Sequence, residues 1–510
     1  MTMDGSFHAT DPATGTLLEP AFAISTAEDV AEACILAAAA FDSFRELDPE
    51  TRARFLDAVA DRIEALGEVL IERAVLESGL PKARLTGERD RTAGQLRLFA
   101  RVLRDGYWAG LTLDTPSPAR QPVPRPDLRQ RKIALGPVAV FGASNFPLAF
   151  SVAGGDTTAA WAAGCPVVVK GHPAHPGTSA LVGSAIREAV EACGLPEGVF
   201  SLLQGPANEL GAALVADPRI KAVGFTGSHA GGLALVEIAH KRREPIPVYA
   251  EMSSVNPVIL FPAALANRAE DLAKGFVGSL TLGSGQFCTN PGIVLAVEGS
   301  DLDTFVQAAG LAIGPIELDA MLTAGIHSNY DRGVAALADH PGVQTVARSA
   351  VSSGCNRPQA AILVTDAATF LADASLSHEV FGAAALIVRC RSLAEIATVL
   401  EGVEGQLTVT LQLDEADHRA AQALLPLLER KAGRVLANGW PTGVEVSYAM
   451  VHGGPYPATS DGRSTSVGAG AIERFLRPVC YQNLPQALLP AMLRDETELR
   501  LPRMLDGQPG

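Results

Sequence analysis

The sequence predicts an α/β fold with two regions in which short strands alternate with helices. At 510 residues the chain is too long for one simple core, so two or three domains are expected. From about residue 132, short apolar stretches alternate with helical ones, which is the pattern of a parallel sheet covered by helices. A second alternating region runs from about 255 to 438.

Composition narrows the classes of function. Hydrophobic residues make up 47% and charged residues 19%, as in a well-packed globular protein. The net charge of -15 argues against nucleic-acid or anionic-membrane partners. The seven cysteines are widely spaced and form no C-x-x-C, so neither a disulfide framework nor a metal site is predicted. A reduced, cytoplasmic location is expected.

The chain begins "MTMDGSFHATDPATG", without the basic and apolar regions of a signal peptide. No apolar run approaches the ~20 residues that would cross a bilayer. Residues 26–105 read as helices, and Thr26 is a candidate N-cap followed by acidic residues. The Pro- and Arg-rich segment 114–132 should be neither a central strand nor a helix interior. It predicts a linker or an arm that reaches a neighbouring subunit.

The first alternating region contains four strand candidates, "IALGPVAVFGA", "GCPVVVKGH", "GVFSLLQG" and "IKAVGFTGS". A helical stretch among them, 177–194, ends on Gly194, a residue type typical of helix C-termini. Ligands of parallel sheets bind at the carboxyl ends of the strands. The motifs "GASNFP", "VVVKGHP" and "GFTGS" lie at such ends, and "VNPVILF" opens the second alternating region.

Several residues at these ends could bind a nucleotide. Gly227, Ser228 and Gly232 could let backbone N–H groups approach a phosphate at a helix N-terminus. The spacing is not G-x-G-x-x-G, so a tight strand-to-helix turn explains it equally well. Lys170 follows the apolar run "PVVV" and could hydrogen-bond a ribose or phosphate, or simply be a solvated strand end.

Other residues could carry chemistry. The Asn145 amide could donate to an oxyanion, although Asn before Phe-Pro is also ordinary turn chemistry. Glu251 follows an apolar run, where burial would raise its pKa and suit a general base; a helix cap or surface position is the alternative. The roles of Glu379 and His452 are equally ambiguous from the sequence, and an isolated histidine is more often structural than catalytic. Cys288, in "GQFCTNPG", could be a nucleophile, a buried small hydrophobe, a metal ligand or a disulfide half.

Taken in order, these residues resemble the aldehyde dehydrogenase superfamily. The series is Asn145, Lys170, Gly227 with Gly232, Glu251, Cys288, and Glu379-x-Phe381. The most specific matches are "SNFPL", "GFTGS" followed by Gly232, and "GQFC". The resemblance covers nearly the whole chain. It implies a doubly wound Rossmann-type cofactor domain, an α/β catalytic domain and a small β arm for oligomerisation.

The resemblance also implies NAD(P)-dependent oxidation of an aldehyde to a carboxylic acid. Cys288 matches the nucleophile that forms a thiohemiacetal and then a thioester. The amide of Asn145 and the backbone N–H of Cys288 match the oxyanion donors. Glu251 matches the base that activates the hydrolytic water. The other six cysteines are expected to be structural.

Further matches concern the cofactor. Glu379 and Phe381 match positions that hold the nicotinamide ribose. Lys170 matches the residue that contacts the adenosine ribose, and Ser228 lies where the turn of the family meets the pyrophosphate. NAD-preferring members often carry a Glu three residues after the lysine, where this chain has Pro173, with His172 nearby. No negative charge opposes a 2′-phosphate, so NADP is expected, with NAD possible. "EMSSVNP" and "EVFGAA" depart from the common family pattern.

These departures resemble one branch of the superfamily, which contains 2,5-dioxopentanoate (α-ketoglutaric semialdehyde) dehydrogenases and an NADP-dependent fatty aldehyde dehydrogenase. "TGVEVSYAMVHGGPYPATS" and the C-terminal tail resemble the first group more closely. The expected reaction is oxidation of 2,5-dioxopentanoate to 2-oxoglutarate; the alternative is a medium- or long-chain aldehyde substrate. Phe146, Phe150 and Phe287 are expected to line the substrate entrance, with His452 near the active site. The arginine that would anchor a distal carboxylate is not identifiable from sequence.

The predicted domains are a cofactor-binding domain (1–115 and 134–252), a catalytic domain (253–440), an oligomerisation arm (116–133 and 475–510), and an active-site loop region (441–474). The arm implies a homodimer or homotetramer. Two other functions compete with aldehyde oxidation. A catalytically silent relative is disfavoured by the intact Cys288, Glu251 and Asn145. An acylating enzyme that passes the acyl group to coenzyme A is disfavoured by Glu251, which would direct water at the thioester.

Overall fold

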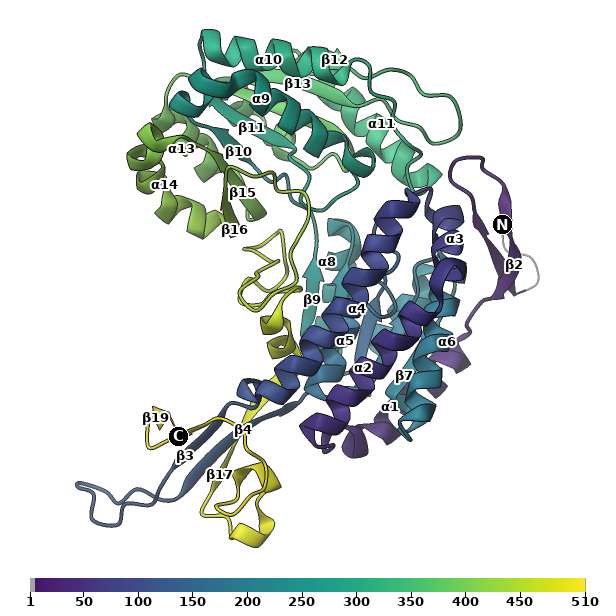
Figure 1. Cartoon of the computed structure of the whole chain (residues 1–510), viewed down its shortest axis with the longest axis vertical. Coiled ribbons are helices and arrows are strands. Elements are labelled where there is room, and N and C mark those ends of the chain that lie inside the picture. The colour runs from purple at the N-terminus through teal and green to yellow at the C-terminus, as the bar shows by residue number, and fades with distance from the viewer. Residues whose placement is uncertain (1–4, 510) are drawn as a thin grey trace.

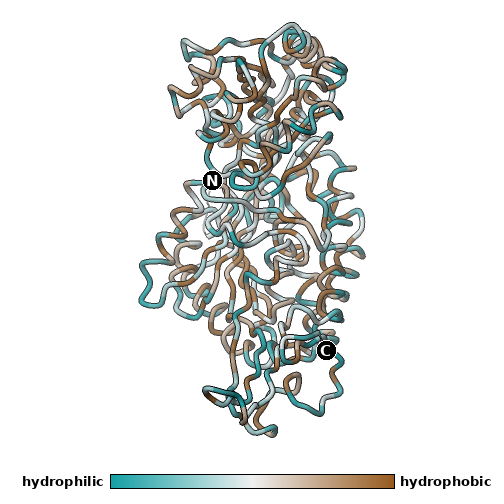
Figure 2. The backbone as a smooth tube through the Cα atoms, turned by 90° about the vertical axis from the view of Figure 1, so that its left-hand side faces the viewer, coloured by the Kyte–Doolittle hydropathy of each residue, from teal (hydrophilic) through white to brown (hydrophobic). Residues whose placement is uncertain are grey.

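The computed structural model describes residues 5–509, so residues 1–4 and 510, which the predicted cofactor domain and arm include, lie outside it. The chain forms two α/β lobes with an extended β arm below them (Figure 1). Hydrophobic stretches lie mainly inside the lobes, and many peripheral turns are hydrophilic (Figure 2). Within the described residues, no helix is both long and apolar enough to cross a membrane.

The first lobe is built on a five-stranded parallel sheet, in the order β7-β6-β5-β8-β9. The four predicted strand candidates form four of these strands, as expected. Alternate residues of one strand face opposite layers, since Val138 and Val140 pack in one cluster and Ala139 in another. The strands are β5 (Val138–Phe141), β6 (Val167–Lys170), β7 (Phe200–Leu203), β8 (Ala222–Thr226) and β9 (Val248–Glu251).

Helices cover both faces of this sheet, which makes the lobe doubly wound. Thr26 caps the first helix as predicted, in a reciprocal capping box with Asp29. Gly194, just past α6, has φ +65°, a left-handed conformation that glycine adopts without strain. The helices are α1 (Ala27–Arg45), α2 (Pro49–Ala65), α3 (Gly67–Ser78), α4 (Lys82–Asp105), α5 (Gly155–Ala163), α6 (Pro176–Ala192), α7 (Asn208–Ala216) and α8 (His229–Lys241). A hairpin, β1 (Ser6–Thr10) with β2 (Leu17–Ala23), lies beside α3 (Figure 1).

The second lobe contains a seven-stranded sheet in the order β12-β13-β14-β11-β10-β15-β16, parallel except for β12. Its strands are β10 (Val258–Leu260), β11 (Ile293–Val297), β12 (Gln344–Arg348), β13 (Ala361–Asp366), β14 (Ala384–Cys390), β15 (Gln406–Gln412) and β16 (Ala432–Ala437). Its helices are α9 (Pro262–Thr281), α10 (Ser300–Ile313), α11 (Ala324–Ala338), α12 (Ala367–Ala372), α13 (Leu393–Gly402) and α14 (His418–Lys431). One apolar cluster fills each face of the sheet.

The arm is a sheet in the order β17-β4-β3-β18-β19. Its strands are β3 (Leu111–Asp114), β4 (Leu128–Ala134), β17 (Leu476–Gln482), β18 (Arg503–Leu505) and β19 (Gln508–Pro509). The expectation that 114–132 contains no central strand is wrong at its end, because β4 lies between β17 and β3. The prolines are confined to residues 116–126, before the strand begins.

Candidate active site

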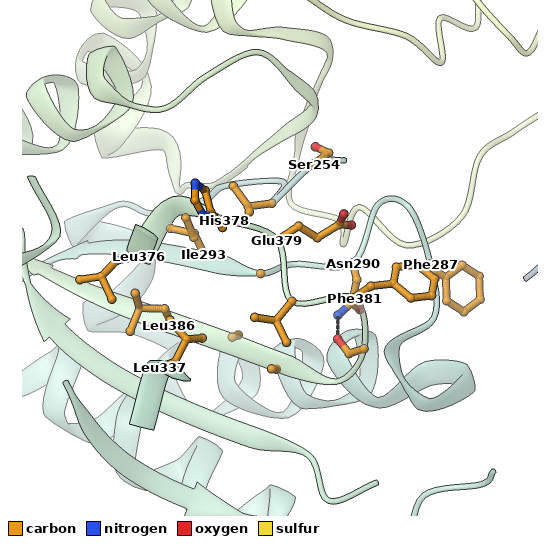
Figure 3. Close-up of a pocket in the computed structure, with 16 residues that line it drawn as sticks. Ser254, Phe287, Asn290, Ile293, Leu337, Leu376, His378, Glu379, Phe381 and Leu386 are labelled. Atoms are coloured by element: carbon orange, nitrogen blue, oxygen red, sulfur yellow. Dashed lines mark hydrogen bonds between the residues drawn. The ribbon is translucent and has the colours of Figure 1, made fainter. Parts of the chain in front are cut away.

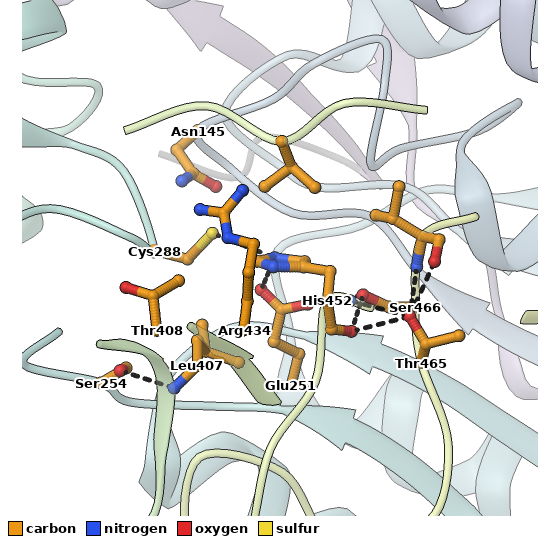
Figure 4. A network of polar contacts seen from close by, with 12 residues as sticks. Asn145, Glu251, Ser254, Cys288, Leu407, Thr408, Arg434, His452, Thr465 and Ser466 are labelled. Carbon is orange, nitrogen blue, oxygen red and sulfur yellow. Dashed lines mark hydrogen bonds and ion pairs between the residues drawn. The ribbon is translucent and has the colours of Figure 1, made fainter. Parts of the chain in front are cut away.

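The candidate site lies where strand β9 of the first lobe, the loop before β11 of the second lobe and the loop 438–468 meet. Glu251 is the last residue of β9, and its neighbour Met252 donates its backbone N–H to Ala458 of the long loop. Cys288 lies between α9 and β11. Figure 4 shows Asn145, Glu251, Cys288, Arg434 and His452 gathered around one centre. The structure therefore brings together the four predicted residues of this set and adds Arg434.

The backbone before Cys288 adopts an unusual conformation. Gly283, Ser284 and Gly285 all have positive φ, of +55°, +58° and +72°. A Cβ on Gly285 would lie 2.2 Å from the backbone nitrogen of Ala383, so only glycine fits there. A non-glycine residue such as Ser284 pays a strain of order 1–3 kcal/mol in this region. The "GSGQFC" sequence is thus required to bend the chain sharply just before the cysteine.

The loop after Cys288 is fixed by Asn256, which sequence reasoning did not single out. Its side-chain amide donates to the backbone carbonyls of Cys288 and Asn290, each at 2.9 Å. Asn256 itself has φ +47°, and its backbone N–H donates to the side chain of Gln406 at 2.9 Å. Asn256 lies in "EMSSVNP", the stretch that departs from the common family pattern.

Glu251, His452 and Cys288 form a compact polar group. Nε2 of His452 lies 2.9 Å from Oε1 of Glu251 and 3.4 Å from Sγ of Cys288. Ser466 donates its hydroxyl to the other carboxylate oxygen of Glu251 at 2.8 Å. The His452 and Glu251 side chains are only 1% and 3% exposed, whereas Cys288 is half-buried. Glu251 and His452 are thus more enclosed than Cys288.

The charges of this group set its protonation state. Burial raises the pKa of Glu251, but His452 and Ser466 outweigh it and hold that pKa below its usual value. The expectation of a raised Glu251 pKa is therefore wrong, because the carboxylate lies in a hydrogen-bonded pocket and not an apolar one. Burial and the Glu251 carboxylate raise the pKa of Cys288 well above its usual value, and Arg434 partly opposes them. Before substrate binds, Glu251 is therefore an ionised carboxylate and Cys288 is a protonated thiol.

Arg434 enters the site from β16 and was not predicted. Its guanidinium donates to the backbone carbonyls of Gly443 and Pro441, at 2.9 and 2.7 Å, while its Nε is buried without a partner. These two bonds hold a positive charge beside Cys288. No local sequence signal distinguishes this arginine. It approaches Cys288 only because β16 packs near the loop that carries the cysteine, which is distant in the sequence.

Asn145 lies close to the cysteine loop. Its Nδ2 donates to the backbone carbonyl of Gln286 at 3.1 Å, two residues before Cys288. Its own backbone carbonyl accepts a hydrogen bond of 2.7 Å from Arg84 of α4. The amide can therefore reach an oxygen that develops next to Sγ of Cys288, provided that it exchanges one acceptor for another.

The three predicted phenylalanines pack together on the α4 side of Cys288. The ring of Phe146 lies 5.2 Å from that of Phe150 and 5.5 Å from that of Phe287. Phe150 also faces the His452 ring at 6.2 Å. These rings form one aromatic group between α4 and the thiol.

The predicted cofactor residues separate into two groups. Glu379 and Phe381 line a pocket in the second lobe, together with Ser254, Phe287 and Asn290 (Figure 3). Burial raises the pKa of Glu379 to about 7, against hydrogen bonds from Ser253 and Ser254. This carboxylate can accept hydroxyl donors, as a sugar binding site requires.

The second group lies at the carboxyl ends of β6 and β8. Ser228 caps α8, accepting a 3.2 Å hydrogen bond from the Gly231 N–H. A Cβ on Gly232 would lie 2.7 Å from Sδ of Met252, so this glycine lets α8 pack closely on β9. A Cβ on Gly227 would meet the Phe225 ring at 2.7 Å. The close turn and the helix N-terminus fit a dinucleotide phosphate.

Lys170 is the last residue of β6, and His172 lies in the loop that follows it. Burial lowers the pKa of Lys170 to about 8. His172 stacks on His175 at 5.4 Å, and burial, with smaller effects of His175 and Lys170, lowers the pKa of His172 well below its usual value. Lys170 therefore carries the positive charge of this loop, and His172 is neutral.

The Glu251, Cys288 and His452 ligand atoms lie within 4.8 Å of one another, close enough to hold a metal ion. The same spacing lets a proton move between the thiol, the imidazole and the carboxylate. A thiol beside a buried carboxylate base, with an amide donor opposite, has the components for covalent catalysis at a carbonyl carbon. Two doubly wound lobes with such a centre between them define a nucleotide-dependent enzyme of the thiol type.

The comparisons with known proteins agree with this class. The model of the aldehyde dehydrogenase family matches residues 2–466. The chain is 59% identical to alpha-ketoglutaric semialdehyde dehydrogenase 2 of Azospirillum brasilense, over 99% of this chain and 96% of the relative. It is 48% identical to alpha-ketoglutaric semialdehyde dehydrogenase of Acinetobacter baylyi, over 98% and 95%. The chain belongs to the aldehyde dehydrogenase family, whose members use NAD(P) and small aldehyde substrates.

Solved structures agree on the fold. Betaine aldehyde dehydrogenase of Staphylococcus aureus superposes with a TM-score of 0.80 at 20% identity, covering 95% of this chain and 93% of the other. An aldehyde dehydrogenase-like structure from Burkholderia cenocepacia gives 0.79 at 21% identity, covering 94% and 97%. The predicted fold class, two α/β lobes with a small β arm, is confirmed.

Proposed function

We propose that this chain oxidises 2,5-dioxopentanoate to 2-oxoglutarate with NADP. The observation that carries the reaction type is the contact of Cys288 with His452, which in turn contacts the carboxylate of Glu251. The substrate rests on the two relatives of 59% and 48% identity, both of which are alpha-ketoglutaric semialdehyde dehydrogenases. These relatives favour the dioxo acid over the fatty aldehyde considered from sequence.

In the proposed mechanism Glu251 accepts the thiol proton of Cys288, and the thiolate attacks the aldehyde carbon. The resulting oxyanion receives hydrogen bonds from the Asn145 amide and the backbone N–H of Cys288. NADP held by Lys170, Ser228, Glu379 and Phe381 would supply a hydride acceptor, and loss of hydride from the thiohemiacetal carbon leaves a thioester on Cys288. After releasing the thiol proton to solvent, Glu251 removes a proton from water, the hydroxide attacks the thioester, and 2-oxoglutarate leaves as Glu251 returns this proton to the Cys288 thiolate.

The cofactor assignment rests on the residues around its expected path. The "GHPAH" loop after Lys170 contains no carboxylate that would repel a 2′-phosphate. Lys170 and the capped turn at Ser228 would bind the adenosine and pyrophosphate parts. Glu379 and Phe381 would hold the nicotinamide ribose. NAD is the secondary cofactor.

The arm supports a homodimer or homotetramer. Val123 and Leu488, which lie in or beside the arm, are 62% and 68% exposed. Burying such side chains against a second copy would remove apolar surface from water. The same proposal includes the domain boundaries, which we place at 115/116, 133/134, 252/253, 440/441 and 474/475.

The proposed function is tested by NADPH formation with 2,5-dioxopentanoate, hexanal and decanal, each also assayed with NAD. We expect the highest kcat/KM for the dioxo acid with NADP. A higher kcat/KM for decanal would overturn the substrate, and a higher kcat/KM with NAD would overturn the cofactor. Sedimentation velocity distinguishes dimer, tetramer and monomer.

A further inference from the structure

One face of helix α4 carries buried positive charge next to the aromatic group. Arg84, Glu88 and Arg91 are spaced by four and three residues, so their side chains lie on the same side of the helix. Arg84 stacks over Phe287 at 4.5 Å and over Phe146 at 4.9 Å. The aromatic group thus has a cationic border on the α4 side.

Arg91 stacks over Phe150 at 5.1 Å, and the ring of His452 lies 6.2 Å from the same Phe150 ring. Phe150 therefore contacts both Arg91 and the imidazole that contacts Cys288. Burial lowers the pKa of Arg91, and the nearby Glu88, Cys288, Glu445 and Glu251 oppose this effect.

Within the described residues, the guanidinium groups on this face form no direct ion pair with a carboxylate. Nη1 of Arg84 and Nη1 of Arg91 are buried without a hydrogen-bond partner, and Arg91 makes only a long 3.4 Å bond to the Val444 carbonyl. Glu88 is the acid between them, but its Oε1 accepts the backbone N–H groups of Leu148 and Ala149. Glu88 and Glu445 both act electrostatically on Arg91, but within the described residues neither forms an ion pair with it.

Buried unpaired cations are costly unless a ligand completes them. Burial lowers the pKa of both arginines, which reflects this cost. A fatty chain would leave these donors unsatisfied, whereas a carboxylate would accept from a guanidinium in a bidentate geometry. The donors are held by ring stacking, so little freedom is lost when an anion binds.

We infer that Arg91, assisted by the charge of Arg84, binds the distal carboxylate of the aldehyde substrate, whose 2-oxo group lies among the phenylalanine rings. The inference rests on the proposed function and names the recognition element for its substrate class. In 2,5-dioxopentanoate the aldehyde and carboxylate carbons are four C–C bonds apart, roughly 5 Å when extended. That reach suits an anchor beside Phe150, whose ring also lies near His452. Arg84 also holds the carbonyl of Asn145, so Arg91 is the cleaner position for a test.

The test compares 2,5-dioxopentanoate with pentanal, which has the same five-carbon chain and no carboxylate. For Arg91→Met, we expect kcat/KM for the dioxo acid to fall about 100-fold, mainly through KM, and kcat/KM for pentanal to stay within about twofold. Arg91→Lys keeps the charge without the fork and should fall in between. Arg101→Met removes an exposed arginine from the same helix and should change neither substrate.

A second readout uses glutarate, a five-carbon dicarboxylate that cannot be oxidised. Glutarate should inhibit pentanal oxidation competitively in the wild type and in Arg101→Met, with about 100-fold weaker inhibition in Arg91→Met. Equal losses for both substrates, or glutarate inhibition that survives Arg91→Met, would overturn the anchor. A wild type that prefers decanal to the dioxo acid would overturn the proposed function before any variant is compared.

Discussion

The two sides of Cys288 differ in how their buried charges are satisfied. On the β9 side, the Glu251 carboxylate accepts hydrogen bonds from Ser466 and His452. On the α4 side, Arg84 and Arg91 keep buried nitrogen atoms without partners. Both oxygens of the Glu251 carboxylate have partners, although Nδ1 of His452 has none. The Glu251 charge is therefore compensated within the protein, whereas the α4 donors can bind a ligand. We therefore assign the chemistry to the first side and substrate selection to the second.

The largest effect is expected at the thiol itself. Cys288→Ala should lower kcat for 2,5-dioxopentanoate on the order of 10⁴-fold or more, because no covalent intermediate can form. The fold should persist, since the side chain is half-buried and its one hydrogen bond is to His452. NADPH formation measures the loss, and Cys480→Ala, at an exposed cysteine, is the matched control. Oxidation that survives Cys288→Ala would place the nucleophile elsewhere.

Glu251→Gln should lower kcat by about 10²–10⁴-fold, because the amide cannot take a proton from the thiol or from water. The loss should be similar for 2,5-dioxopentanoate and pentanal, in contrast to the selective loss at Arg91. Steady-state kinetics with both aldehydes check this, with Glu401→Gln at an exposed glutamate as control. A loss confined to the dioxo acid would mean that Glu251 selects the substrate and does not act as the base.

His452→Phe tests what sets the protonation state. His452 holds the pKa of Glu251 below its usual value, so its removal should raise that pKa. A base works above its pKa, so the acidic limb of the kcat profile should move to higher pH. Ser466→Ala should shift the limb in the same direction by less, because its contribution is smaller. We expect losses of about tenfold on the acidic side for His452→Phe; an unmoved limb would contradict the assignment.

The smallest effect is expected at Arg434, which lowers the pKa of Cys288 against the stronger opposing effects of burial and Glu251. Arg434→Met should shift the alkylation of Cys288 by iodoacetamide to higher pH, with a rate about two- to fivefold lower at fixed pH. Peptide mass spectrometry resolves Cys288 from the exposed Cys355 and Cys480. The exposed Arg430→Met is the control, and an unchanged alkylation profile would mean that Arg434 does not act on the thiol.

Much of the fold could be predicted because its signals are local. Alternating apolar strands and helices, the Thr26 cap and the glycine at 194 are all readable within a few residues. Strand β4 was missed because its sequence is polar and follows a proline-rich stretch. It is stabilised by pairing with β17, whose residues 476–482 lie far away in the sequence.

The site divides in the same way. Asn145, Glu251 and Cys288 lie in short, recognisable motifs, and the structure brings them together with His452. The pKa of Glu251 could not be foreseen, since it depends on a histidine and a serine about two hundred residues later. The arginines of α4 look like ordinary helical charges in the sequence. Their burial appears only when the helix packs on the phenylalanine rings.

A crystal structure of the Cys288→Ala variant with 2,5-dioxopentanoate and NADP would test both sides at once. The account predicts the aldehyde carbon beside residue 288, its oxygen near the Asn145 amide, and the distal carboxylate in a bidentate pair with Arg91. A substrate in the reverse direction, or a carboxylate bound by Arg434 with Arg91 still unpaired, would contradict the division of roles between the two sides.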